Sequence, residues 1–69
     1  MAQKHSLTNR EIQILELLSQ GLSSAEIAQQ LFISPNTVEF HRKQLLRKTD
    51  SRNVAHLIGN AFRKKLLTL

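Results

Sequence analysis

The chain has 69 residues, enough for one domain near the lower size limit for an unaided hydrophobic core. It has no cysteine, which excludes disulfides and thiolate metal sites and suits a reducing cytoplasm, and no apolar run approaches the about 20 residues of a membrane span. With 41% apolar residues, a formal charge of +5 and little room for an enzyme's cleft, the chain is expected to be a small helical binding module.

The charge is unevenly distributed along the chain. Residues 1–39 carry a net charge of −2, whereas residues 40–69 carry +7. A basic half of this density is the electrostatic footprint of a protein that binds a polyphosphate; a solvated surface kept for solubility is the alternative. Its cations are Arg42, Lys43, Arg47, Lys48, Arg52, Arg63, Lys64 and Lys65.

The first predicted helix follows a leader, residues 1–6, that we expect to be disordered. Thr8 and Glu11 have the spacing of a capping box, and Gly21 suits a helix C-terminus, so we expect a helix over residues 9–20. The inward-facing residues are expected to be Ile14, Leu15 and Leu18.

The second and third predicted helices are separated by a tight turn. Ser23 and Glu26 repeat the capping-box spacing and predict a helix over residues 24–31. A helix over residues 35–48 is expected to follow, with a serine as N-cap and a proline at its first position. Two short helices joined in this way are typical of a helix-turn-helix, whose second helix enters the major groove of DNA.

The third predicted helix has two distinct faces. At about 100° per residue, Asn36, Phe40, Lys43 and Arg47 form one stripe, which is free to contact a ligand. The opposite stripe packs inward and consists of Val38, His41 and Leu45; His41 is expected to be packed and hydrogen-bonded.

A fourth helix is predicted from Val54 to about Lys65, with Asn53 as its N-cap. Its apolar stripe is expected to close the core mainly through Leu57 and Phe62. The remaining apolar residues, Leu66, Leu67 and Leu69, extend this stripe toward the end of the chain.

The pattern as a whole resembles the LuxR/FixJ/GerE-type helix-turn-helix domain of bacterial transcription regulators, over residues 7–67. The matching residues are Leu7-Thr8, Arg10-Glu11, Ile14-Leu15, Gly21-Leu22-Ser23, Glu26-Ile27-Ala28, Leu31-Phe32-Ile33-Ser34, Thr37-Val38, His41-Arg42, Leu45 and Arg47-Lys48. The resemblance implies an all-α, compact four-helix bundle in which helix 35–48 is the recognition helix. The turn Thr49-Asp50-Ser51 departs from the Leu-Gly-Val-like turn common in the family and removes apolar anchors for the fourth helix.

The resemblance also implies partners. The fourth helix forms the dimer contact of the family on DNA, and we assign Ile58 and Ala61 to it. An upstream phosphoacceptor receiver or ligand-binding domain is implied as well, as in a response regulator. We expect a cytoplasmic homodimer on double-stranded DNA, with no cofactor and no membrane contact.

Base contacts are expected from the exposed stripe, and the resemblance places them at positions 39, 40 and 43. Lys43 can reach a guanine or a phosphate, and Asn36 can pair with adenine or bind a phosphate near the helix start. Phe40 suits a thymine methyl group, unless its ring folds back on another helix. Glu39 is expected to accept from a cytosine amino group or to repel a wrong register.

Phosphate contacts are expected from hydroxyl groups and from cations beside this stripe. For Arg42 the alternative is a solvated charge or an ion pair. The histidines share no metal-ligand spacing, so no metal site is expected. The assigned phosphate contacts are Ser23, Ser34, Thr37, Arg42, Arg47 and Lys48.

Three other functions are alternatives to a dimeric DNA-binding regulator. A sigma region-4-like module would read a promoter element while docked on RNA polymerase. A protein-interaction module would use Phe40 and the apolar face of the fourth helix. Catalysis is the weakest alternative, because no nucleophile–base pair or carboxylate pair stands out in the sequence.

Overall fold

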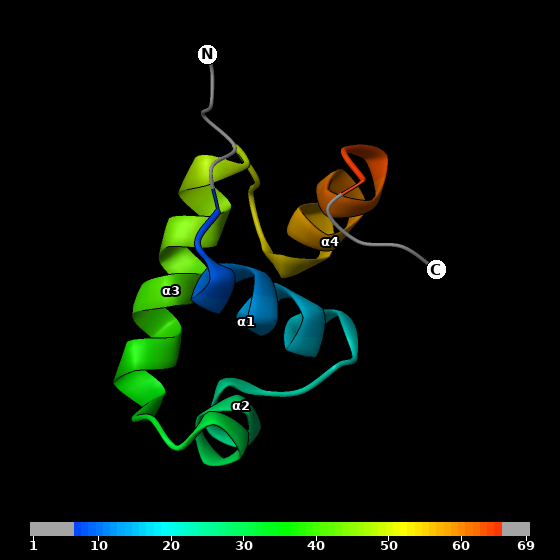
Figure 1. Ribbon diagram of the computed structural model, residues 1–69. Helices are drawn as coiled ribbons and strands as arrows, with labels where there is room; N and C mark the ends of the chain where they lie inside the picture. The colour runs from blue at the N-terminus through cyan, green and yellow to red at the C-terminus, as the bar shows by residue number, and fades with distance from the viewer. Residues whose placement is uncertain (1–6, 66–69) are drawn as a thin grey trace.

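A computed structural model describes residues 7–65, and these residues form four helices joined by short turns (Figure 1). The helices are α1 (Asn9–Ser19), α2 (Ser24–Leu31), α3 (Pro35–Lys48) and α4 (Val54–Arg63). The described residues contain no strand, which confirms the predicted all-α fold. None of the helices among them is long and apolar enough to cross a membrane. The expected leader and the leucines at positions 66, 67 and 69 lie outside the described residues.

The helix starts agree with the predicted capping residues. The side chain of Thr8 accepts from the backbone N–H of Glu11 at 3.1 Å, and the Glu11 carboxylate accepts from the Thr8 N–H at 2.9 Å. Ser23 and Glu26 form the same reciprocal pair at the start of α2. Asn53 caps α4 by accepting from the third N–H of that helix. Each start is therefore determined by residues within one helical turn.

The helix ends follow a common geometry that the sequence only partly indicates. Gly21 follows α1 with φ 90°, as predicted, so α1 ends at Ser19, one residue before the expected boundary. Phe32, Asp50 and Lys65 adopt the same left-handed conformation after the other helices, with φ of 59°, 54° and 62°. These three side chains carry a Cβ in a region that favours glycine. The left-handed residue at position 65 also ends α4 at Arg63, two residues short of the expected boundary.

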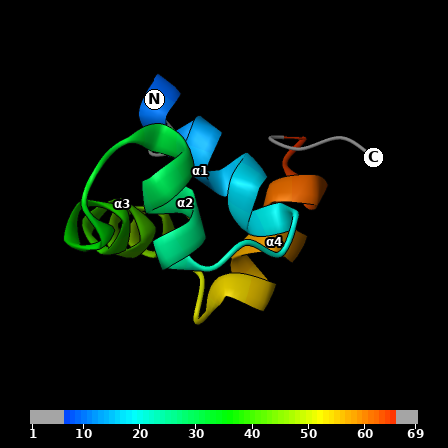
Figure 2. The same cartoon turned by 90° about the horizontal axis from the view of Figure 1, so that it is seen from below.

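The hydrophobic core lies around α1, which contacts each of the other three helices. Ile14 and Leu15 of α1 are completely buried, and so are Val38, Leu45 and Leu57 of the helices packed on it. Both views show α3 along one side of the molecule and α4 on the other (Figures 1 and 2). One flank of α3 therefore faces away from the bundle.

The turn between α3 and α4 is anchored by a buried polar cluster in place of the apolar anchors that it lacks. The Thr49 hydroxyl donates to the carbonyl of Leu45 at 2.7 Å and lies 2.6 Å from the hydroxyl of Ser51. The Asn60 amide, on α4, donates to Ser51 Oγ at 2.9 Å. Thr49 and Asn60 are both buried. The turn Thr49-Asp50-Ser51 lacks the apolar anchors common in the family, and these hydrogen bonds hold α4 in position instead.

Candidate nucleic-acid interface

The outer flank of α3 carries the predicted contact stripe. Asn36, Phe40, Lys43 and Arg47 are all exposed. The Phe40 ring is 57% exposed and makes an edge contact with the neighbouring His41 ring, with centroids 5.5 Å apart, so it does not fold into the core. From Asn36 to Arg47 the stripe rises about 16 Å along the helix, at about 1.5 Å per residue. The major groove, about 12 Å wide, admits an α-helix.

The start of α3 presents two hydroxyl groups toward solvent. Ser34 accepts from the backbone N–H of Thr37 at 3.1 Å, and its Oγ lies 2.9 Å from Thr37 Oγ1. Both residues are exposed, as is Ser23 at the start of α2. The first N–H groups of a helix and such hydroxyls form a partly positive surface that suits an anion.

Arg42 and Glu39 form an ion pair on α3. Arg42 donates to Glu39 Oε1 from Nε at 3.0 Å and from Nη2 at 2.7 Å. The other carboxylate oxygen, Oε2, accepts from the hydroxyl of Ser24 at the start of α2. The hydrogen bond from Ser24, followed by those from Arg42, holds the pKa of Glu39 below its ordinary value. Arg42, for which an ion pair was the alternative to a phosphate contact, thus forms an ion pair in this structure.

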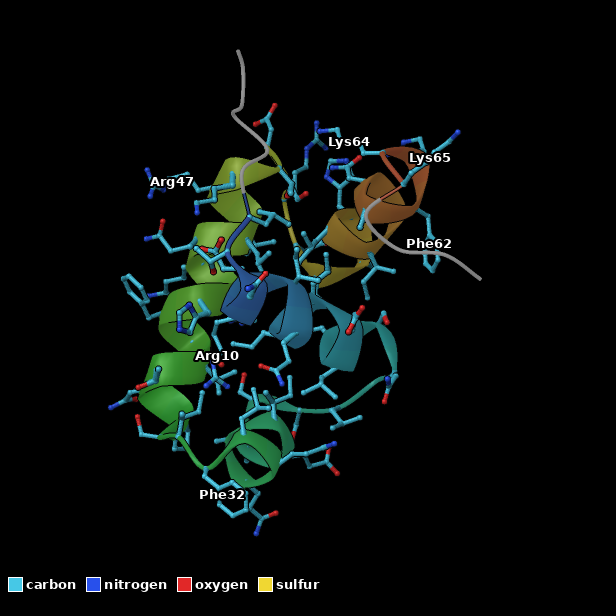
Figure 3. All side chains as sticks on the ribbon, in the orientation of Figure 1. Arg10, Phe32, Arg47, Phe62, Lys64 and Lys65 are labelled. Carbon is cyan, nitrogen blue, oxygen red and sulfur yellow. The ribbon has the colours of Figure 1, made fainter. Side chains whose placement is uncertain are left out.

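Lys48 also has an intrachain partner. Its Nζ lies 2.9 Å from Oε1 of Glu11, whose side chain is 5% exposed. Burial raises the pKa of Glu11, but the bond from Lys48 and the backbone N–H of Thr8 outweigh that effect, and the pKa lies below its ordinary value. Lys48 therefore joins α3 to α1. It was expected to contact a DNA phosphate, and this contact within the chain was not expected. Arg47, by contrast, is exposed and extends away from the bundle (Figure 3). It donates to the side chain of Gln44, three positions earlier on the same helix.

Two expectations need correction. His41 is half-buried, but its Nδ1 is buried and has no hydrogen-bond partner among residues 7–65, so the expected hydrogen bond at this nitrogen is not made. Ala61, assigned to a dimer contact, is completely buried in the core of the single chain. Ala61 lies one helical turn after Leu57, on the face of α4 that packs inward, and has no surface to offer a partner.

The partly exposed flank of α4 contains other apolar residues. Val54, Ile58 and Phe62 pack against the edge of the core and remain only half-buried. They are spaced four residues apart, so they lie on one flank of the helix. Figure 3 shows Phe62 on the side of α4 that faces away from α3. This flank has apolar surface that a partner chain can contact, whereas Ala61 has none.

Phe32 and Ser24 have positions in the structure that the sequence does not indicate. Phe32 lies in the turn between α2 and α3, is 93% exposed and extends from the far end of the molecule (Figure 3). Ser24 was expected only as the first residue of a helix, yet it contacts Glu39, fifteen positions away. No local pattern marks either feature, because each depends on how α2 and α3 pack. In the part of the chain that the structure describes, no group of histidine and carboxylate residues could hold a metal ion.

Comparison with known proteins agrees with this geometry. Residues 5–61 match the model of the family described as bacterial regulatory proteins, luxR family. The chain is 39% identical over 61 residues to the oxygen regulatory protein NreC of Staphylococcus haemolyticus and to that of Staphylococcus carnosus. The NreC protein of Staphylococcus aureus has the same identity. The match covers 88% of this chain but 28% of each of these relatives.

The chain therefore belongs to the luxR family of bacterial regulatory proteins. Its helix-turn-helix is of the DNA-binding type that serves transcription regulation, and the family is one of regulators, not of enzymes.

Proposed function

We propose that this domain binds double-stranded DNA in a sequence-specific manner, with the outer flank of α3 in the major groove. The observation that carries the proposal is the exposed stripe of Asn36, Phe40, Lys43 and Arg47 on the second helix of a helix-turn-helix. The stripe combines an amide, an aromatic ring and two cations, which suit adenine, thymine methyl and guanine edges or phosphates.

Phosphate contacts then flank this stripe and set the register of the protein on the duplex. Ser23, Ser34 and Thr37 contribute hydroxyls and nearby backbone N–H groups, and Arg42 and Arg47 contribute charge. We assign no phosphate contact to Lys48, because its Nζ is bonded to a buried carboxylate.

A homodimer on DNA would use the flank of α4 that carries Ile58 and Phe62. Both side chains are half-buried in the single chain. Helix α4 itself lies on the side of the molecule opposite α3 (Figure 1). Two copies joined there would present two recognition helices to the same face of the duplex. A site with approximate two-fold symmetry is the expected target.

The chain spans 28% of the length of the curated relatives that it matches. We infer that it acts as the output domain of a longer cytoplasmic regulator, preceded by a receiver or ligand-binding domain that controls dimerisation. As part of the same proposal, the whole regulator contacts RNA polymerase.

Selection of bound duplexes from a random library at physiological salt tests the proposal. Enrichment of a two-fold motif with fixed half-site spacing is expected. A single unsymmetrical element would favour the sigma-like alternative, and salt-sensitive binding without enrichment would leave charge as the sole source of affinity.

A variant of α4 tests the dimer separately. Ile58→Glu is expected to remove the preference for a duplex with two half-sites over one with a single half-site. Ala55→Glu adds the same charge at an exposed position of α4 and is the matched control. Equal behaviour of the two variants would exclude this flank as the dimer contact.

A further inference from the structure

The carboxylate of Glu39 is engaged on both of its oxygens within the chain. Oε2 accepts from the hydroxyl of Ser24, in the first turn of α2, and Oε1 accepts two hydrogen bonds from the guanidinium of Arg42. Glu39 therefore connects the first helix of the helix-turn-helix to the second, and it also holds the nearest cation of α3. We name these three residues the α2–α3 clip.

We propose that Glu39 is a positioning residue for the recognition helix and does not itself read a base. This inference rests on the proposed binding of DNA by α3. It differs from the role that the family resemblance implies for position 39, where a base contact is expected.

The geometry supports a positioning role because apolar packing alone is not directional. Ile27 and Ala28 of α2 and Val38 of α3 are buried in the same core cluster, and this packing determines how closely the two helices approach. A hydrogen bond adds a preferred distance and angle. The bond from Ser24 to Glu39 is a second attachment between these helices, so it restrains their sliding and rotation.

The clip also orients Arg42. Only part of the guanidinium is used by Glu39, because Nη1 and one N–H of Nη2 are not needed for the two bonds to Oε1. Those remaining donors can reach a phosphate while the arginine is held in one rotamer. A side chain fixed before binding loses less conformational freedom when it contacts DNA.

A base-reading role fits the contacts less well. A carboxylate reads cytosine by accepting from its amino group, so one of its oxygens must be available. Oε1 of Glu39 already accepts two hydrogen bonds and Oε2 accepts one, so three of the about four acceptor sites of the carboxylate are in use. The side chain is also only 38% exposed. Turning it toward a base would break the link to α2 and release Arg42.

The first test needs no DNA. Melting temperatures are measured for Ser24→Ala, Glu39→Ala and the double variant, and the clip predicts that the two losses are not additive. Additive losses would show that the two side chains do not interact and would overturn the proposal. Glu39→Gln retains one acceptor for Ser24 and keeps the test decisive if Glu39→Ala does not fold. Glu16→Gln, an exposed carboxylate on α1, controls for the change in net charge.

The second test measures base preference by library selection, at a temperature where every variant is folded. Ser24→Ala and Glu39→Ala are both expected to weaken binding by about 3- to 10-fold, the loss that corresponds to one hydrogen bond. The preferred sequence is expected to stay the same at every position.

A changed preference at one base pair in Glu39→Gln, absent in Ser24→Ala, would make Glu39 a base-reading residue. Unchanged affinity in both variants would reduce the clip to a purely structural role and would also overturn the proposal. Failure of the unmodified domain to select any sequence would instead overturn the proposed function, while the melting series would still decide whether the clip exists.

Discussion

Lys48 Nζ lies 2.9 Å from Oε1 of Glu11, and this ion pair joins the last turn of α3 to the first turn of α1. The same carboxylate oxygen accepts from the backbone N–H of Thr8, so one side chain caps α1 and anchors the recognition helix. Removal of Lys48 would leave the buried Glu11 carboxylate without its cationic partner. The pair therefore ties the stability of the domain to the orientation of its proposed DNA-binding face.

Lys48→Ala is expected to lower the free energy of unfolding by about 1–3 kcal/mol, because the buried Glu11 carboxylate loses its cationic partner. Urea denaturation at neutral pH measures this loss. Lys43→Ala removes an exposed cation from the same helix and is expected to change the free energy of unfolding by less than about 0.5 kcal/mol. Equal effects of the two substitutions would contradict a structural role for Lys48.

The stability of the domain should fall in acid. The pKa values of Glu11, Glu26 and Glu39 in the folded chain all lie below the ordinary value of 4.5. The unfolded chain therefore binds more protons between the folded and the ordinary pKa values. The stabilisation is complete above pH 4.5 and is lost as the pH falls through the lowered pKa values.

Glu11→Gln isolates one contribution to this pH dependence. The variant should be less stable than the unmodified domain at neutral pH, and the difference should shrink as the pH falls below 4.5, where Glu11 itself becomes protonated. Urea denaturation at a series of pH values between neutral and about 3 measures the difference. A constant difference over that range would show that ionisation of Glu11 does not stabilise the fold.

Asn60→Ala is expected to lower the free energy of unfolding by about 1–2 kcal/mol. The substitution removes the amide that donates to Ser51 Oγ at 2.9 Å, inside the cluster that holds the turn before α4. Thermal denaturation measures the loss, and Asn36→Ala, at an exposed site on α3, is the control. A loss no larger than that of the control would show that apolar packing alone positions α4.

Gly59→Ala is expected to raise the free energy of unfolding by about 0.5–1 kcal/mol, because glycine is a poor helix former. A Cβ at this position would lie 3.7 Å from Nη1 of Arg63, an ordinary van der Waals contact with a flexible side chain. Thermal denaturation of the free domain measures the gain. A loss of stability would show that the folded domain does not accommodate a methyl group at position 59.

The features that could be predicted from the sequence are those determined over one helical turn. The capping pairs Thr8–Glu11 and Ser23–Glu26 gave correct starts for α1 and α2, because each partner lies three positions away. The inward and outward stripes of α3 followed from the helical period. The sequence indicates the helix ends less clearly, since Phe32 and Lys65 adopt a conformation that favours glycine without being glycine.

The contacts that the sequence did not indicate join residues far apart in the chain. Glu11 and Lys48 are 37 positions apart, and Ser24 and Glu39 are 15 apart. Their proximity results from the packing of whole helices, for which no local spacing is diagnostic. The assignment of Lys48 and Glu39 to DNA rests on charge, helical phase and the family resemblance, and none of these indicates an intrachain partner.

Arg47→Ala is expected to weaken binding to specific and random duplexes by similar factors, because a phosphate contact carries no sequence information. Loss of one phosphate contact also reduces the slope of log affinity against log salt by about 0.9. Titrations at several salt concentrations measure both effects. An unchanged slope would remove Arg47 from the interface.

Lys43→Ala separates base reading from simple attraction. Lys43 is exposed near the middle of the α3 stripe, between Phe40 and Arg47, where a helix in the major groove meets base edges. If its ammonium group donates to a guanine, the substitution should weaken binding to the selected sequence by about 1–3 kcal/mol and relax the preference at one base pair. Titration against the selected duplex and against a duplex altered at that base pair measures both effects. Equal losses on the selected and random duplexes would make Lys43 a phosphate contact, and sequence choice would then depend on Asn36 and Phe40.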